Sequence, residues 1–361
     1  MKKIYINILC ILLLPIALLL NFIASKYPNM VEILYSTTIN KVTIEILSFI
    51  TGWIPFSLYD IFVVLVCIGL IVYIISVIRR CFIYRKNILR ILTKGLLNIV
   101  SFFSVLYFLF IVLWGINYNR VPFNESIGVS ITKHNYEDLG SLYEYLINEC
   151  NSIRAKLPED SSGVVEINDY KSIFNRAEKG YNAIDNLYPT LKGNYSKPKY
   201  ILSSEIFNYT GITGIYFPYT GQANVNVKVP LMTIPATTLH EMAHQRGYAH
   251  EDEANFIAYL ASINHPDLDF QYSGYLLALA HTSNALYTAN IDLLKSLNGK
   301  LSDAVMRDLI YKSEFWQKYE GQVSKVSSKI NDSYLKSNGV SDGEKSYGRM
   351  VDLLLSYYDN L

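Results

Sequence analysis

The sequence predicts a mainly α fold with a small β-sheet, in which three N-terminal transmembrane helices precede an α+β domain. Two observations support this prediction. Hydrophobic residues make up 51% of the 361 residues, a high share for a soluble enzyme, and the long uncharged runs are confined to the first third. A His-Glu-x-x-His motif at residues 240–244 then lies in the remaining part, residues 120–361. We therefore treat residues 1–119 and 120–361 as separate regions.

Three uncharged runs, at about residues 4–25, 61–78 and 95–119, are long enough to cross a bilayer. The two lysines before the first run also suit a cleavable signal peptide. We favour an uncleaved span, because this apolar run is long for a signal and no small-x-small cleavage site follows it. Residues 1–119 are thus predicted to form a membrane anchor, with the lipid bilayer as a partner.

The distribution of basic residues predicts the orientation in the membrane. Six Lys or Arg residues fall within 79–94, whereas the segment between the first two runs has only Lys26 and Lys41. Since short cytoplasmic loops are enriched in Lys and Arg, the N-terminus and the basic loop should be cytoplasmic. The chain would then be a multi-pass cell-membrane protein with residues 120–361 outside the cytoplasm. The formal net charge of +1 argues against a nucleic-acid partner.

The His-Glu-x-x-His motif predicts a zinc site. His240 and His244 lie four residues apart, so on a helix they share one face and can bind one metal ion. Pro235 suits the first turn of such a helix, and Gly247 suits its end. Glu241 is placed to act as a general base on a zinc-bound water. The alternative is an inert helix whose histidines are incidental.

Two residues compete as the third zinc ligand. His250 completes the spacing His-Glu-x-x-His-x-x-Gly-x-x-His, which is typical of metzincins. Glu251 begins a second predicted helix with the pattern Glu-x-x-Ala-Asn at 251–255, which is typical of gluzincins. Acidic residues at this position can also simply stabilise a helix N-terminus. We favour Glu251, with His250 as the alternative ligand.

Other residues are candidates for supporting roles. Asn255, one turn after Glu251, could be a hydrogen-bond partner of a ligating histidine, and the Tyr347 hydroxyl could stabilise an oxyanion. Alternation at 224–229 predicts a strand whose free edge could pair with an extended peptide, or which only covers the core. We expect His265 to be a surface residue of a connector. Further helices are expected at about 136–156, 167–186, 269–297, 302–335 and 345–358.

Four segments together resemble a bacterial family named domain of unknown function 3810. They are residues 214–226, 239–261, 273–281 and 346–358. The resemblance implies membrane spans followed by an extracytoplasmic, zincin-like domain, and a membrane-anchored zinc metallopeptidase of gluzincin type without an established substrate. It also implies that the acidic segment recurs in the family whereas a histidine at position 250 does not, which favours Glu251.

These patterns predict a zinc metalloendopeptidase that hydrolyses a peptide or protein substrate outside the cytoplasm. The alternative is a non-catalytic, zinc-containing receptor or envelope assembly factor with a zincin-like fold. A third reading, a membrane scaffold with incidental histidines, requires no metal.

Overall fold

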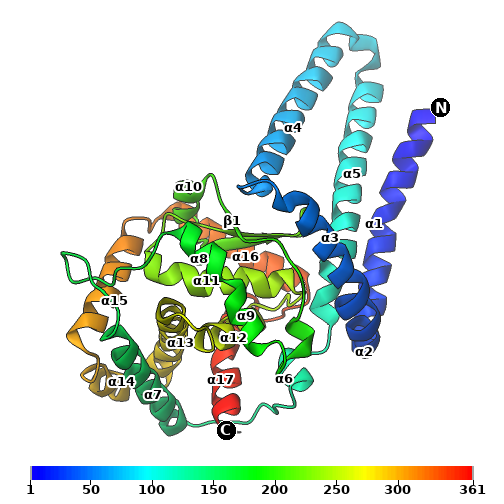
Figure 1. Cartoon of the computed structure of the whole chain (residues 1–361). Helices are drawn as coiled ribbons and strands as arrows, with labels where there is room; N and C mark the ends of the chain where they lie inside the picture. The colour runs from blue at the N-terminus through cyan, green and yellow to red at the C-terminus, as the bar shows by residue number, and fades with distance from the viewer. Residues whose placement is uncertain (1, 360–361) are drawn as a thin grey trace.

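A computed structural model describes residues 2–359, except for the side chains of residues 2, 3 and 347. Within this part of the chain, three helices are long and apolar enough to cross a membrane. They are α1 (Lys2–Lys26), α4 (Leu58–Ile83) and α5 (Ile88–Leu113). Both α1 and α4 pack against α5, and the three project together from the rest of the molecule (Figure 1).

The predicted runs correspond to these helices, but the second and third differ at both ends, since α4 covers Leu58–Ile83 and α5 covers Ile88–Leu113. Helix α4 is longer than the run 61–78 because Ser57 caps it: the Ser57 hydroxyl accepts a hydrogen bond from the Tyr59 N–H. The run 95–119 extends past the end of α5, since residues Gly115–Asn119 form a short 3₁₀ helix, η3. In η3, Asn117 and Tyr118 are buried against the globular part, so these residues leave the spanning helix to make tertiary contacts.

The segment between α1 and α4 joins the membrane anchor to the globular part. It consists of the short helix α2 (Pro28–Met30), the π-helix η1 (Val31–Asn40) and α3 (Lys41–Gly52). Glu32 on η1 makes a salt bridge with the buried Arg120, with 2.7 Å between Oε1 and Nη2. Asn117 accepts a hydrogen bond from the Ser36 hydroxyl and donates one to Asn40. Residues from both regions therefore form one packed junction.

The globular part is mainly helical, and the hydrophobic core lies around its central helices. Helices α11 (Ile234–Gln245), α12 (Glu251–Ile263) and α13 (Leu268–Ala289) pack on one another, and α7 (Tyr136–Arg154) packs on α13. The other elements are α6 (Phe123–Ser126), α8 (Tyr170–Arg176), α9 (Glu178–Ile184), η4 (Pro189–Leu191), α10 (Ser204–Asn208), η5 (Leu231–Thr233), α14 (Ile291–Asn298), α15 (Asp303–Gln317), α16 (Gln322–Ser337), η6 (Gly343–Arg349) and α17 (Met350–Tyr358); η2 (Arg85–Asn87) joins α4 to α5.

The predicted helix 167–186 is divided into α8 and α9, with Ala177 between them. Two longer predicted helices are also divided in the structure. The segment 269–297 contains α13 and α14, because Asn290 leaves the helical conformation and its side chain accepts a hydrogen bond from the Leu293 N–H. The segment 302–335 contains α15 and α16, which are separated by a turn that includes Gly321. Apolar spacing continues across both breaks, so it could not reveal them.

The sheet has three strands, β1 (Lys199–Tyr200), β2 (Gly214–Phe217) and β3 (Gln222–Val225), in the order β1-β3-β2. β3 is parallel to β1 and antiparallel to β2. The prediction of a free-edged strand at 224–229 is therefore wrong, since the strand ends at Val225 and both its edges are paired. Asn224 and Asn226 are buried rather than outward-facing, and the Asn226 amide donates to Asn208.

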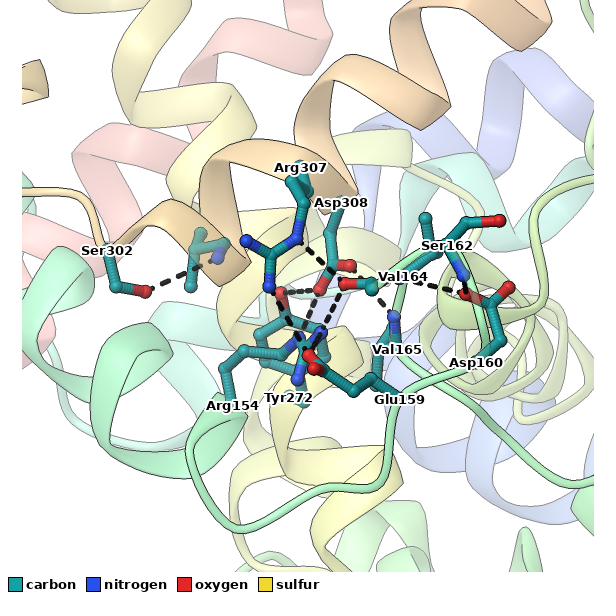
Figure 2. A network of polar contacts seen from close by, with 12 residues as sticks. Arg154, Glu159, Asp160, Ser162, Val164, Val165, Tyr272, Ser302, Arg307 and Asp308 are labelled. Carbon is teal, nitrogen blue, oxygen red and sulfur yellow. Dashed lines mark hydrogen bonds and ion pairs between the residues drawn. The ribbon is translucent and has the colours of Figure 1, made fainter.

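A buried carboxylate joins three helices on the far side of the core from the anchor. Asp308 on α15 accepts hydrogen bonds from the Arg154 Nε–H at 2.7 Å, the Tyr272 hydroxyl at 2.6 Å and the Val165 N–H at 2.9 Å (Figure 2). Its side chain is fully buried and that of Arg154 nearly so. Asp308 thus accepts from three donors, while Arg154 Nη2 donates to Glu159 and to the Gly163 carbonyl, so the buried charges are satisfied.

We predict that Asp308→Ala destabilises the protein by about 3–5 kcal/mol, because it leaves the buried Arg154 Nε–H and two further donors without their acceptor. Thermal unfolding of the detergent-solubilised chain would measure this loss. The matched control is Glu144→Ala, which removes the partner of Lys300 in an exposed ion pair and should cost at most about 1 kcal/mol. Equal losses for the two variants would contradict the prediction.

Candidate metal centre

The motif lies at the C-terminal end of α11, and a tight turn leads from it into α12. The Gly247 N–H donates to the His244 carbonyl at 2.9 Å, and the Tyr248 N–H donates to the Ala243 carbonyl at 3.3 Å. These two bonds form the Schellman arrangement that closes a helix, which requires a residue with positive φ. Gly247 has φ +84°. The chain therefore reverses within five residues and begins α12 at Glu251, beside the two histidines.

The side chains of His240, His244 and Glu251 converge. Glu251 Oε2 lies 3.2 Å from His240 Nε2 and 3.6 Å from His244 Nε2, and the three donor atoms lie within 4.8 Å of one another. Zinc bonds of about 2.0 Å in a tetrahedral arrangement place neighbouring ligand atoms about 3.3 Å apart. This donor set therefore fits a zinc ion and fills three of its four positions.

Hydrogen bonding orients one of the imidazoles. His244 Nδ1 lies 2.6 Å from the Tyr248 carbonyl oxygen, and a carbonyl only accepts hydrogen bonds, so Nδ1 carries the proton. The lone pair of Nε2 then points toward Glu251, as a metal ligand requires. The Trp114 ring, from the residue that follows α5, packs edge-on against the His244 ring with centroids 5.7 Å apart. A residue from the end of a membrane helix thus helps to fix a ligand.

Charge coupling within the cluster favours an ion pair when metal is absent. Burial lowers the pKa of His244, but the adjacent Glu251 carboxylate outweighs burial and raises the pKa to about 9. Burial raises the pKa of Glu251, but the two histidines outweigh it and hold that pKa well below its usual range. Because a protonated imidazole cannot bind metal, metal loading at neutral pH should release a proton.

Glu241 is a buried carboxylate directed toward β2. Its Oε2 has no hydrogen-bond partner among the described residues. Burial raises the pKa of Glu241 to about 7, although the charges of His240 and His244 and the Tyr216 N–H oppose the shift. Gly214 makes room for this side chain, because a Cβ on Gly214 would overlap Glu241 Oε1. A carboxylate in this state can accept and release a proton near neutral pH.

The outer edge of β2 runs past Glu241. The Asn226 N–H donates to the Thr213 carbonyl at 2.9 Å, so residue 213 hydrogen-bonds toward β3. In an antiparallel pair this direction alternates along the strand, and the backbone groups of Gly214 and Tyr216 therefore point to the outer edge. The sheet edge next to the motif thus belongs to β2 and not to residues 224–229.

His250 points away from the cluster. Its Nε2 lies 3.1 Å from the Tyr118 carbonyl oxygen. It lines a separate cavity of about 700 Å³, together with Asp252, Glu253 and Arg349. Of the two candidates for the third ligand, the structure therefore brings Glu251, and not His250, to the histidines.

The other predicted residues have different outcomes. Asn255 is buried on α12, and no described hydrogen bond joins it to His240 or His244, so its role stays a prediction. Tyr347 lies in η6, and its side chain is outside the part that the structure describes. The expectation for His265 is wrong. This side chain is fully buried because it stacks on the Phe270 ring at 3.8 Å.

Several residues around the site were missed from the sequence. The Arg120 guanidinium lies 3.8 Å from the centre of the Tyr248 ring, and its Nη1 donates to the Arg246 carbonyl. Trp114 and Gly214 act on the site from more than twenty residues away along the chain. No local motif marks any of these contacts, because each depends on how distant segments pack.

Comparison with known proteins identifies a family but no activity. A family model described as protein of unknown function (DUF3810) matches residues 35–355. Neither the curated proteins nor the solved structures contain a match. The resemblance predicted from the sequence is therefore confirmed at the level of the family, and the chemistry has to be argued from the site.

We predict that the full chain binds one zinc ion and that His244→Ala or Glu251→Ala abolishes this binding, since each removes one of three converging ligands. The matched control is His250→Ala, which alters the residue next to Glu251 and should retain zinc. Metal analysis of the dialysed, purified protein measures the stoichiometry. Loss of zinc in His250→Ala with retention in Glu251→Ala would reverse the assignment.

We also predict that Gly247→Ala lowers both thermal stability and zinc affinity. An L-residue at this φ costs about 1–2 kcal/mol, and the added Cβ would lie only 3.2 Å from Asn117 Oδ1. The control Gly339→Ala also has positive φ, +93°, but its Cβ would meet no atom within 4 Å. It should lower stability without changing zinc affinity, as measured by competition with a chelator. Equal zinc affinities in the two variants would show that this turn does not position the ligands.

Proposed function

We propose that this chain, which belongs to the DUF3810 family, is a membrane-anchored, zinc-dependent endopeptidase that cleaves a peptide or protein substrate outside the cytoplasm. The observation that carries this proposal is the convergence of His240, His244 and Glu251 beside the buried Glu241, whose Oε2 has no hydrogen-bond partner among the described residues. A site that only stored zinc would have no need for this fourth side chain.

The residues divide into ligands and a proton carrier. When bound, zinc supplies a Lewis acid and makes water nucleophilic at neutral pH. His240, His244 and Glu251 would hold the ion. Glu241 accepts a proton from the attacking water while the water oxygen forms a bond to the peptide carbonyl carbon. As the C–N bond breaks, Glu241 returns this proton to the leaving amine.

The edge of β2 supports a peptide as the substrate. The backbone groups of Gly214 and the Tyr216 carbonyl point outward there, whereas the Tyr216 N–H bonds to Glu241. An extended peptide can pair with the remaining groups of such an edge. Pairing would carry the peptide past Glu241, because Gly214 lies directly beside this carboxylate. The absence of a side chain at position 214 also keeps this approach clear.

The proposed location follows from the basic residues between α4 and α5. The connection between these helices lies at the end of the spans that is farthest from the globular part (Figure 1). Its arginines and lysines favour the cytoplasm. The metal centre would then lie on the other side of the membrane.

We predict that Glu241→Gln retains zinc but lowers turnover by about 10²–10⁴-fold, because it removes the proton acceptor and leaves the ligands in place. The assay uses the full chain in vesicles with a library of fluorescence-quenched peptides, alongside metal analysis. Glu137→Gln, an exposed change on α7, is the matched control and should cleave like the wild type.

Two outcomes would count against the proposal. Full turnover in Glu241→Gln would remove Glu241 as the base. If the zinc-loaded wild-type protein cleaves no peptide of the library, the non-catalytic receptor or assembly factor is favoured instead.

A further inference from the structure

Helix α16 presents its polar face to the protein. The Ser328 hydroxyl and the Asn331 amide both donate hydrogen bonds to the Glu344 carboxylate on η6, at 2.6 and 3.0 Å. The Glu344 N–H donates in turn to Asp332 at 3.1 Å. The packed side of this helix is therefore held largely by polar contacts, with Leu335 buried near its end.

The opposite side of α16 is an exposed apolar stripe. Val323, Val326, Ile330 and Tyr334 are spaced by three and four residues, so they lie on one face of the helix. Their exposed fractions are 55%, 54%, 65% and 38%. A helix on the surface of a soluble domain normally turns such a stripe toward the core. On α16 the apolar side faces outward instead, and such an exposed stripe indicates an apolar partner outside the globular part.

The two ends of α16 lie beside the membrane helices. At one end, the Tyr334 ring lies 6.2 Å from the Phe110 ring of α5, and its hydroxyl lies 3.3 Å from that of Tyr118. At the other end, Tyr319 packs edge-on against Tyr209, directly after α10. Helix α10 in turn contacts the start of α4, since the rings of Phe207 and Tyr59 lie 5.9 Å apart. The helix thus runs from the vicinity of α4 to that of α5.

Apolar surface continues from the spanning helices to α16. A cavity of about 710 Å³ lies between them, with Leu14, Ile99 and Phe103 on one wall and Tyr334 on the other. Beside α4, a second group of exposed apolar residues follows β1: Leu202, Ile206 and Tyr209, with exposed fractions of 53%, 68% and 50%. The stripe of α16 is therefore part of an apolar surface that is continuous with the membrane anchor.

A row of lysines lies along another face of α16. Lys325, Lys329 and Lys336 are exposed, and their spacing of four and seven residues places them on one side of the helix. An apolar stripe beside a basic row is typical of helices that lie in the membrane interface, where lysines meet anionic headgroups. The charge of α16 thus suits the same partner as its apolar face.

We propose that α16 is an interfacial helix, whose Val323–Tyr334 stripe enters the leaflet on the globular side of the membrane. The occupant of the stripe is the lipid of the bilayer that α1, α4 and α5 cross. Together with the spans, α16 would hold the globular part against the membrane surface. The inference depends on the spanning helices and not on the peptidase activity.

The test measures the lipid contact of single positions on α16. Cys10, Cys67 and Cys81 are replaced by serine, while Cys150 is kept because it is fully buried. Ile330→Cys and, as its control, Glu137→Cys on α7, which lies away from the spanning helices (Figure 1), are each labelled with a polarity-sensitive fluorophore. The full chain is reconstituted in vesicles of phosphatidylcholine and phosphatidylglycerol, with or without nitroxide-labelled lipid. Both positions are exposed, so neither substitution should disturb folding.

We expect a blue-shifted emission and several-fold stronger quenching by nitroxide lipid at position 330 than at position 137. Equal, weak quenching at both positions would overturn the proposal. Emission at position 330 that changes with protein density but not with nitroxide lipid would also overturn it, because it would identify a second copy of the chain as the occupant.

Discussion

The metal centre depends on one backbone constraint, the reversal of the chain at Gly247. Without a residue at positive φ, α11 could not close within five residues of a helix that starts at Glu251, and the carboxylate would not meet the imidazoles. This turn is packed from outside the motif. Asn117, Arg120 and Asn40 surround Gly247, and Arg120 is itself held by Glu32. The geometry of three ligands is thus built on contacts with the base of the membrane anchor.

The anchor is therefore part of the site as well as a tether. Trp114 packs against His244. Arg120, whose charge is paired with Glu32, lies between η1 and the ring of Tyr248. A buried charge such as this is tolerated only while its partner is in place, because desolvation of an unpaired charge is costly. A fragment that begins at residue 120 would lose Trp114, Asn117 and Glu32. The packing of the apolar helices and the geometry of the candidate metal centre are physically coupled for this reason.

Glu241 illustrates the cost of a reactive group. A buried carboxylate oxygen without a partner is unfavourable, and folding stability alone would select a different side chain. The structure nevertheless preserves room for it, with a glycine at position 214 and an edge strand beside it. Such locally unfavourable features concentrate where chemistry occurs, and this one lies directly next to the converging ligands.

The sequence by itself determined the apolar spans, the helix that carries His240 and His244, and the identity of the family. These depend on composition and on spacing within one turn of a helix, which are local properties. The choice of Glu251 over His250 was favoured but left open, because both follow the same glycine and only the packed turn decides which side chain points inward. Only the tertiary structure placed β3 in the centre of the sheet and the edge of β2 beside Glu241. It also directed the apolar face of α16 outward. The spacing of apolar residues in the sequence indicates that such a face exists, but it does not show what packs against it.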